Sequence, residues 1–404
     1  MLKSGPDRRQ VVAGAVATAS LAACAKNPAM APRIAVVGAG MAGSSAAMRL
    51  ALRGAQVTLF DQFQFGHEMG SSHGTTRLFR TAYFEHPNYV PILQRAMSMW
   101  KEFEKQIGET LFVQAGVLEA GPHDGFLLAG LRAAIETHRL PVDFLDAAAL
   151  KRDHPLLTLP PSFEAVFEHE AGFVFAGKTV ASQIRIAKEN GAQLRPQARI
   201  ASWAPAKDGV ALITDRGEDI FDRVVIAAGV WANGLLDLPV AEVTPVPKTL
   251  FWRQPETDAF DLGNGFAPFA VETEDGRLFY GFPSIDADGV KVAEHTGGES
   301  LASPEDRSFD PAPNEEADLD AFLLSTIPSL AGRPGKHQGC LYEISSDHHF
   351  LIDRHPKSDR VIFAAGLSGH GFKFAPVLGE ALAIMALEDR TPEGWEFLSL
   401  ARFS

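Results

Sequence analysis

Arg33-Ile-Ala-Val-Val-Gly38-Ala-Gly40-Met41-Ala-Gly43 is the stretch that decides the fold of this 404-residue chain. Its apolar, β-branched start is typical of a short buried parallel strand. The G-x-G-x-x-G fingerprint follows. Its first Gly permits a tight turn, its second lets the backbone approach a pyrophosphate, and its third lets a helix pack on the strand. We therefore predict a dinucleotide-binding unit here.

The residues after the fingerprint continue the same unit. A helix is predicted to about Arg53, where Gly54 ends it, and its first N–H groups would hold phosphates. A second strand, 56–60, leads to Asp61, and an acid at this place accepts hydrogen bonds from ribose hydroxyls. An ordinary strand-turn-helix with glycines is the alternative, and the order of strand, triplet, helix, strand and acid argues against it. The fingerprint does not distinguish NAD from FAD.

Two later segments predict further strands of the same sheet. One is the apolar run 222–229, which ends in a glycine turn before Trp231, and the other is the run 361–366. A helix is predicted over 375–387. One sheet that draws on both ends and the middle of the chain explains them. We therefore expect an α/β fold with a discontinuous Rossmann-like domain, into which segments of a second domain are inserted.

Composition narrows the class of protein. The chain is 46% hydrophobic and 22% charged, as in an ordinary soluble protein, with a net charge of −13. This balance argues against nucleic-acid binding through bulk charge, since such binding needs clustered Lys and Arg. Two cysteines are too few for a disulfide framework. We predict no metal site.

Three further segments carry a family resemblance. They are Gly70-Ser-Ser-His-Gly-Thr-Thr-Arg-Leu-Phe-Arg-Thr-Ala-Tyr83, Cys340-Leu-Tyr342 with Phe350-Leu-Ile-Asp353 downstream, and Gly366-Leu-Ser-Gly-His-Gly-Phe-Lys373. They resemble the flavin-binding motifs of monomeric sarcosine oxidase and N-methyltryptophan oxidase, which belong to the D-amino-acid oxidase superfamily of FAD enzymes. The resemblance is colinear over about 33–387. It implies the FAD fold, with a second domain built on a mixed or antiparallel sheet.

The resemblance implies a cofactor, FAD, and the residues that bind it. Cys340 would form a covalent bond to the flavin 8α-methyl carbon, and because a thiolate is the nucleophile, nearby cations should lower the pKa of this thiol. His73 and Arg77 would flank the flavin ring, and a helix start at 371–374 would direct its positive end at the reduced flavin. A buried, inert thiol is the alternative for Cys340. The implied cofactor-binding residues are Gly38, Gly40, Met41, Gly43, Asp61, Ser71, Ser72, His73, Thr76, Arg77, Trp231, Cys340, Gly369, Gly371, Phe372 and Lys373.

The same resemblance also implies which residues bind the substrate. Arg80 and Lys373 match the family's carboxylate clamp, in which Arg offers a planar fork and Lys a point charge. Lys291 matches the lysine assigned to oxygen activation, where a fixed positive charge stabilises superoxide. The residues implied to line the substrate cavity are Tyr280, His295, Tyr342 and His370. Surface charge is the structural alternative for each cation, and a satisfied structural role is the alternative for each histidine.

The implied reaction is the oxidation of an N-methyl or cyclic secondary amino acid. A hydride equivalent passes from the carbon next to nitrogen to flavin N5, the imine hydrolyses, and oxygen is reduced to hydrogen peroxide. A dehydrogenase that passes electrons to a membrane carrier is the nearest alternative. A non-catalytic lipoprotein that keeps the flavin fold is the alternative of another class.

The chain departs from the family at a few positions, which leaves the particular amine open. Thr75 stands where relatives often have Asp, the loop before Lys291 carries Asp286 and Asp288, and the pair 348–349 is His-His. We predict an FAD-binding domain over 33–110, 170–245 and 338–404, and a substrate domain over 111–169 and 246–337.

The N-terminus predicts export. Arg8-Arg9 precedes an Ala-rich uncharged run, as in a twin-arginine signal. Leu21-Ala-Ala-Cys24 resembles a bacterial lipobox, so 1–23 would be a signal peptide, Cys24 an acylated N-terminus and 24–32 a tether. The predicted location is the periplasm or cell envelope, with membrane contact only through this anchor. A disordered tail on a cytoplasmic protein is the alternative.

Overall fold

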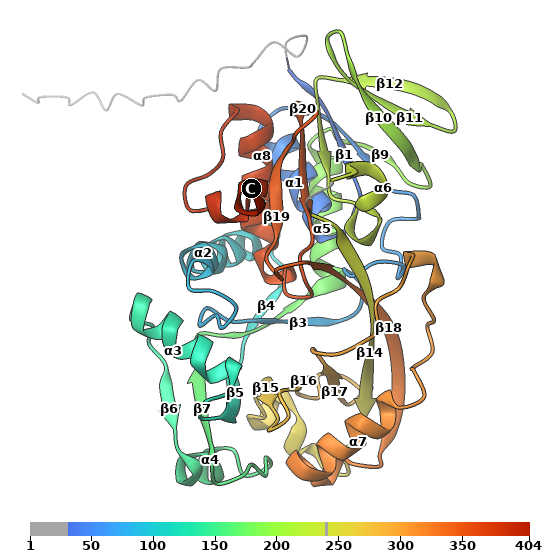
Figure 1. Cartoon of the computed structure of the whole chain (residues 1–404). Coiled ribbons are helices and arrows are strands. Elements are labelled where there is room, and N and C mark those ends of the chain that lie inside the picture. The colour runs from blue at the N-terminus through green and yellow to red at the C-terminus, as the bar shows by residue number, and fades with distance from the viewer. Residues whose placement is uncertain (1–30, 239–240) are drawn as a thin grey trace, which may run out of the picture. The chain divides into compact units, whose positions relative to one another are not determined.

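A six-stranded sheet draws on both ends and the middle of the chain, as the sequence predicted (Figure 1). The computed structural model describes residues 31–238 and 241–404, and the N-terminal signal and Cys24 lie outside the described residues. β1 pairs in parallel with β2 and β13, and β13 pairs in parallel with β20. In order, the strands are β19 (Leu351–His355), β20 (Ser358–Ala365), β13 (Arg223–Ile226), β1 (Arg33–Val37), β2 (Gln56–Phe60) and β9 (Gln193–Arg195).

Both faces of this sheet are buried, which explains the continuous apolar run of β1. Ile34 and Val36 pack in one core with α1 (Met41–Leu52), α5 (Ala176–Glu189) and α8 (Ala375–Glu388). Ala35 and Val37 pack in a second core, under the small sheet of β10 (Ile200–Ala206), β11 (Gly209–Thr214) and β12 (Gly217–Phe221) and the short helix α6 (Asn233–Leu236). A strand covered on both faces needs apolar residues at every position.

The second large sheet has eight strands and is mixed. Its strands pair antiparallel except for β5 and β15, which are parallel, so the predicted mixed sheet is confirmed. In order, they are β18 (Pro334–Ser345), β14 (Val243–Arg253), β17 (Val290–Glu294), β16 (Leu278–Phe282), β15 (Phe269–Glu272), β5 (Val117–Pro122), β7 (Phe163–Glu168) and β6 (Asp143–Leu145).

The two faces of the eight-stranded sheet differ in chemistry. Alternate residues such as Phe279 and Val292 pack against α7 (Glu315–Thr326) in an apolar core. Because side chains alternate along a strand, Tyr280 and Lys291 face the other way. We call this other side the inner face. Lys248 lies opposite Cys340 on the paired strands β14 and β18, and register places both on this face.

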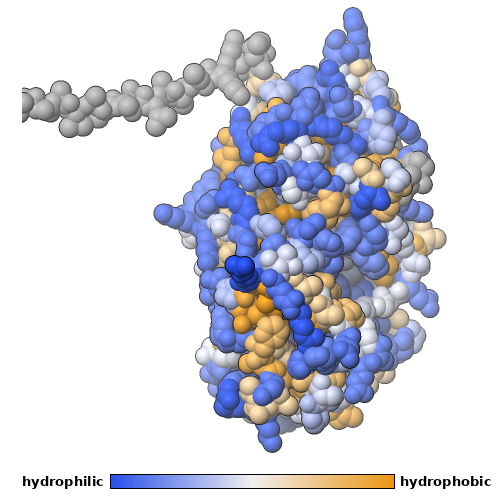
Figure 2. Space-filling model, turned by 60° about the vertical axis from the view of Figure 1, so that its left-hand side comes forward, coloured by the Kyte–Doolittle hydropathy of each residue, from blue (hydrophilic) through white to orange (hydrophobic). Residues whose placement is uncertain are grey.

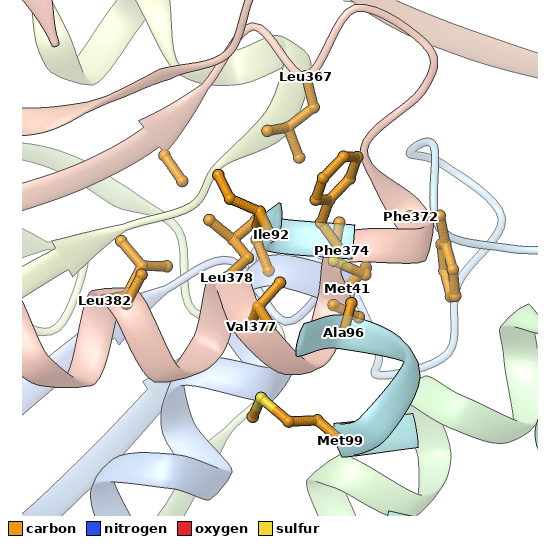
Figure 3. Packing of buried hydrophobic residues seen from close by; sticks show 14 of the residues in the cluster. Met41, Ile92, Ala96, Met99, Leu367, Phe372, Phe374, Val377, Leu378 and Leu382 are labelled. Atoms are coloured by element: carbon orange, nitrogen blue, oxygen red, sulfur yellow. The ribbon is translucent and has the colours of Figure 1, made fainter. Parts of the chain in front are cut away.

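A small sheet lies between the two large sheets (Figure 1). The small sheet joins β3 (Thr76–Phe79), β8 (Gly172–Phe175) and β4 (Phe112–Gln114). The helix α2 (Tyr89–Ile107) packs on α8, with Ile92, Ala96 and Met99 against Val377 and Leu378, and Phe374 lies beside them (Figure 3). This core supports the short 3₁₀ helix Phe372–Phe374, which carries two predicted site residues.

Of the remaining helices, α3 (Phe126–His138) packs on β5 and β7, and α4 (Ala147–Asp153) contacts β6 and β7. The surface in Figure 2 is mostly hydrophilic, with an apolar area on its lower half. Among the described residues no helix is long and apolar enough to cross a membrane. The predicted domain limits stay a prediction, and those at 245 and 338 fall within β14 and β18.

Candidate active site

The fingerprint glycines close the turn between β1 and α1 by direct backbone contact. A Cβ on Gly43 would lie 1.8 Å from the Gly38 carbonyl oxygen, and one on Gly38 would lie 2.2 Å from the Ala227 carbonyl oxygen. Gly38 has φ +97, which L side chains rarely adopt. The turn therefore leaves no room for a side chain, and backbone N–H groups can approach a ligand there.

A cavity of about 480 Å³ opens at this turn. It runs from the fingerprint past the end of β2 to the loop before α8, and Glu343 of β18 is one of its walls. Asp61 accepts a hydrogen bond from the Ala39 N–H at 2.8 Å, so its carboxylate is anchored at the cavity edge. The predicted cofactor residues that line it are Gly38, Gly40, Met41, Asp61, Ser71, Ser72, His73, Arg77, Trp231, Gly369, Gly371 and Phe372. The other four, Gly43, Thr76, Cys340 and Lys373, are not among the residues that line it.

The loop Gly70–Thr76 forms one side of the cavity. The Ser72 hydroxyl accepts a hydrogen bond from the Met41 N–H at 2.9 Å, which ties the loop to the start of α1. Arg77 donates to the carbonyls of Ser71 and His73 at 2.9 and 2.8 Å, so its guanidinium holds the loop in shape. Burial and the nearby Arg77 lower the pKa of His73 to about 3, so this ring is neutral.

Cys340 is buried in the middle of β18 and is the free cysteine of the described residues. The expectation that its thiol pKa is lowered is wrong for this structure, because burial raises it. Arg77, Lys291 and Arg307 act in the opposite direction, but desolvation is the larger effect. The sequence indicated that cations would lie near this thiol, but it did not single out Arg307 and could not show how completely the sulfur is removed from water.

Lys291 is 3% exposed and points from β17 toward β3, the strand that follows the loop Gly70–Thr76. Its ammonium donates to the Thr76 carbonyl at 2.8 Å and lies in close contact with the Thr76 hydroxyl. Burial, with Arg77 as the next cause, lowers its pKa well below the usual value. The alternative of a solvent-facing lysine is excluded.

Arg80 is also buried, and acids surround its guanidinium. Nη2 pairs with the Glu85 carboxylate at 3.0 Å, and Nε lies 3.2 Å from Glu119. Nη1 donates to the Ala82 carbonyl at 3.1 Å. These acids raise the pKa of Arg80 further. The predicted clamp arginine is thus present. Each of its three nitrogens faces a group of the protein, but a guanidinium has five N–H groups, so N–H groups remain for a ligand.

Lys373 lies beside Arg80, and both cations contact the ring of Tyr83. The Arg80 guanidinium carbon is 4.6 Å and the Lys373 ammonium 4.9 Å from the centre of that ring. Lys373 donates to the His370 carbonyl at 2.8 Å, and burial with Arg80 lowers its pKa to about 7. The structure therefore brings the two predicted clamp residues together.

His370 is held at both ring nitrogens. Nε2 lies 3.0 Å from the His348 carbonyl oxygen, which can only accept, so this nitrogen carries the proton. Nδ1 then accepts from the Tyr83 hydroxyl at 2.6 Å. Burial lowers the pKa of His370 well below its usual value. The ring is therefore a neutral link between Tyr83 and the 348 loop.

A second group of polar side chains lies on the inner face of the eight-stranded sheet. The Tyr280 and Tyr342 hydroxyls are hydrogen-bonded, and Tyr342 lies 3.3 Å from His295 Nδ1. Burial lowers the pKa of His295 to about 3. A Cβ on Gly369 would lie 2.3 Å from the Tyr342 ring, so the loop before α8 packs directly on that ring. All seven predicted catalytic residues thus fall into neighbouring clusters between the two large sheets.

Sequence reasoning missed Glu85, Glu119 and Lys248. Lys248 is buried, and its ammonium donates to the carbonyls of Thr296 and Gly297 at 2.5 and 2.6 Å, next to His295. Burial lowers its pKa to about 8. A Lys in the apolar strand 243–253 and a Glu in the apolar strand 117–122 were the available signals, since charged residues are rarely buried without a function or a partner.

The family model for FAD-dependent oxidoreductases matches residues 33–385 of this chain. The chain belongs to the FAD-dependent oxidoreductase family. Two relatives are the N-methyl-L-tryptophan oxidases of Yersinia pestis (strain Pestoides F) and Yersinia pseudotuberculosis (serotype O:1b, strain IP 31758). Each is 34% identical over 369 residues, which is 91% of this chain and 98% of the relative.

Solved structures of oxidoreductases share the fold of this chain. NikD, an amino acid oxidase essential for nikkomycin biosynthesis, matches in its open form with a TM-score of 0.79 at 22% identity over 91% of this chain and 96% of its own. L-proline dehydrogenase from P. horikoshii matches with a TM-score of 0.78 at 22% identity over 92% and 98%. At this identity these structures show the fold alone, and they confirm the predicted α/β fold class.

The residues around the cavity fit the FAD of this family. The side-chain-free turn at Gly38 and Gly43 admits a pyrophosphate, and the anchored Asp61 lies where a ribose would be bound. The wall residues Arg77 and His73 reach the far end, toward Lys291 and Cys340. No group of three or more His, Cys, Asp or Glu suited to a metal is found among the described residues.

Proposed function

We propose that this protein is an oxidase of N-methyl or cyclic secondary amino acids that uses oxygen as electron acceptor. The observation that carries the proposal is the pair of buried cations, Arg80 and Lys373, on the ring of Tyr83 beside the flavin-cavity residue Phe372. A carboxylate fits two such cations. The 34% identical relatives are N-methyl-L-tryptophan oxidases, which supports a secondary amine next to that carboxylate.

The chain's own residues would orient the substrate and exclude water. Arg80 and Lys373 hold the carboxylate, while Tyr280 and Tyr342 on the inner face bound the space for the amine. The neutral His295 and His370 can share hydrogen bonds without adding charge. Burial without a counter-charge lowers the pKa of Lys291, so negative charge that develops on oxygen favours the protonated form of this amine. The protonated Lys291 then stabilises that negative charge in a site without water. When bound, FAD supplies the acceptor for the hydride equivalent and returns its electrons to oxygen.

Anaerobic titration with secondary amino acids tests this function. Sarcosine, N-methyl-L-tryptophan and L-pipecolate are added to the flavin-loaded protein, and the flavin absorbance is followed. At least one should bleach it, and air should restore it with release of hydrogen peroxide. Bleaching by a secondary amine without peroxide, with fast reduction of a dye, would point to the dehydrogenase. No bleaching by any secondary amine would favour the non-catalytic lipoprotein.

We also propose that FAD is attached to Cys340. Three cations, Arg77, Lys291 and Arg307, act on this buried sulfur. The Ser71 hydroxyl donates a hydrogen bond to the carbonyl of the next residue, Leu341. The intact mass should exceed that of the chain by one FAD and should survive acid precipitation. The Cys340→Ser variant should lose that mass. Flavin that is freely released by acid from the wild-type protein contradicts the attachment.

Export and a lipid anchor at Cys24 complete the proposal. The twin-arginine route carries folded proteins, as a flavoprotein loaded in the cytoplasm requires. Cell fractionation should place the protein in the envelope, and Cys24→Ala should release it from membranes. An Arg8→Lys, Arg9→Lys pair should retain it in the cytoplasm. Equal distribution of wild type and both variants would refute the signal.

A further inference from the structure

Glu119 is a buried carboxylate beside the predicted clamp, and the proposed function gives it no role. Sheet register places Glu119 of β5 opposite Ala270 of β15, and Ala270 opposite Tyr280 of β16. Residues in register share a face of the sheet, so Glu119 lies on the inner face with Tyr280. The small side chain of Ala270 is all that separates them in this row.

The contacts of Glu119 differ from those of the buried glutamates on the neighbouring strands. Glu168 of β7 and Glu272 of β15 each accept hydrogen bonds from backbone N–H groups. Glu119 is 1% exposed, and neither of its oxygens has a hydrogen-bond partner within the described part of the chain. Its nearest cation is Arg80, whose Nε lies 3.2 Å from Oε1. Its environment is therefore defined by Arg80.

Stability does not explain this arrangement. Glu85 already pairs with Arg80 through Nη2 at 3.0 and 3.2 Å, so Glu119 is a second anion on one cation. A carboxylate that is buried without hydrogen bonds costs several kcal/mol, and a buried ion pair is often no better than apolar side chains. Since Glu119 is unfavourable for folding at this position, its presence is best explained by its effect on the charge around Arg80.

The charge balance of the cluster indicates how Glu119 affects ligand binding at Arg80. Above about pH 8, Lys373 (pKa about 7) is neutral and Glu119 (pKa about 8) is ionised, so Arg80, Glu85 and Glu119 together carry one net negative charge. Glu168 lies beside them, but its oxygens are held by the backbone N–H groups of Thr81 and Ala82. A substrate carboxylate would add a further negative charge in a site that excludes water, which is unfavourable. Two protons taken up from solvent, one by Lys373 and one by Glu119, restore the balance, and Glu119 can accept its proton because its oxygens are free of backbone donors.

The groups that face Glu119 favour its protonated form. Burial raises the pKa of Glu119 to about 8, with Glu168 of β7 and Glu85 acting in the same direction. Arg80, and Lys373 from the 3₁₀ helix before α8, act in the opposite direction. Tyr83 also faces the cluster, and burial raises its pKa so that it stays neutral.

We propose that Glu119 is a positioning residue that takes up a proton when a substrate carboxylate reaches Arg80, and that it thereby sets how strongly the site prefers a carboxylate to an uncharged group. This inference rests on the proposed function, because it needs a carboxylate at Arg80. No electron transfer is involved: the proton comes from solvent and returns to it when the carboxylate leaves.

The test measures binding of propionate and of propionamide to the flavin-loaded protein by flavin absorbance, over about pH 7 to 9.5. In the wild-type protein the dissociation constant for propionate should rise steeply above about pH 8, since both Lys373 and Glu119 must be protonated. Glu119→Gln should make the slope of log Kd against pH smaller by about one. It should also bind propionate about tenfold more tightly at pH 9. Propionamide binding should not change.

Glu272→Gln is the matched control, because it alters a buried glutamate of the adjacent strand whose oxygens serve backbone N–H groups. It should keep the wild-type slope. A slope in Glu119→Gln equal to that of the wild type, or weaker propionate binding in this variant, overturns the proposal. So does a wild-type protein that does not prefer propionate to propionamide.

A second measurement needs no variant. A pH-indicator dye reports the protons that the wild-type protein takes up per propionate at about pH 9, and about two are expected from Lys373 and Glu119. One or fewer overturns the proposal even if Glu119→Gln does not fold. Failure of the proposed function is separate from this, since it shows as no bleaching by any secondary amine.

Discussion

The proposed cofactor end of the molecule is built from backbone, and the proposed substrate end is built from buried charge. At the first, Gly38 and Gly43 leave no room for a side chain, and the ligand meets N–H groups and one anchored acid, Asp61. At the second, Arg80 and Lys373 are cations removed from water beside acids. Backbone geometry is local in sequence, whereas charge balance depends on residues from distant strands.

The two ends should therefore respond differently to mutation. At the backbone site any added side-chain atom overlaps the neighbouring backbone, so ligand binding is lost. At the charged site the loss of stability or binding depends on which charged partner is removed and on whether the remaining charge keeps a counter-charge. The changes below probe one end against the other.

Gly43→Ala should have the largest effect. Its Cβ would lie 1.8 Å from the Gly38 carbonyl oxygen, so the turn that receives the pyrophosphate must move. Flavin per protein, measured by absorbance after purification, should fall to less than about a tenth. Gly263→Ala is the control, because a Cβ there meets nothing within 4 Å in the described structure. Full flavin content in Gly43→Ala would break the comparison at its cofactor end.

Arg80→Gln should come next. The change leaves Glu85 and Glu119 buried without their cation, which costs about 3–5 kcal/mol of unfolding free energy. Propionate binding should weaken by about 10- to 100-fold, since a charged hydrogen bond is lost. Urea unfolding and flavin absorbance measure the two effects. Arg95→Gln, at a side chain 52% exposed, should change neither. An Arg80→Gln protein as stable as the wild type would show that the acids there are not ionised.

Lys291→Met should leave the cofactor in place and affect one half-reaction. Reoxidation of the reduced protein by oxygen should slow by about 10²- to 10³-fold, because the amine that stabilises negative charge on oxygen is removed. Reduction by the amine should change little. Stopped-flow absorbance separates the two steps, and exposed Lys188→Met serves as control. If both steps slow equally, Lys291 acts on the fold of the loop through Thr76 and not on oxygen.

Lys248→Met should show the smallest effect, visible in the pH dependence of stability. Burial lowers the pKa of Lys248 from 10.5 to about 8, so the unfolded chain binds the proton more strongly than the folded one. The wild-type protein should therefore gain stability relative to the variant as pH rises from about 8 to about 10.5, by at most about 3 kcal/mol. Urea unfolding at several pH values measures the difference. Parallel curves would mean that the two carbonyl acceptors keep this lysine fully charged.

The sequence predicted the cofactor end closely. The strand, turn and helix at 33–52 are local, and each residue type there has a backbone reason that is visible without a structure. It also predicted which residues meet at the substrate end, because the family resemblance names them. It did not predict that Glu119 reaches Arg80, since β5 and the segment after β3 meet only through the folded sheets.

The thiol of Cys340 shows the same limit. The sequence indicated that cations lie near it, but the direction of its pKa depends on the competition between those cations and burial, and burial is larger. Net effects of this kind are small differences between large opposing contributions. They can be read only when the whole environment of a group is known.

β18 has a consequence for how this enzyme could change. Cys340 and Tyr342 are two residues apart on one strand and so point to the same side, about 7 Å from each other along the chain. Strand β18 thus fixes the distance between the proposed flavin attachment at Cys340 and the proposed substrate contact at Tyr342. This distance cannot change gradually, because a one-residue shift of the strand would turn both side chains to the other face together. New substrates would then have to be accommodated by changes away from β18, for example around Arg80 and its acids.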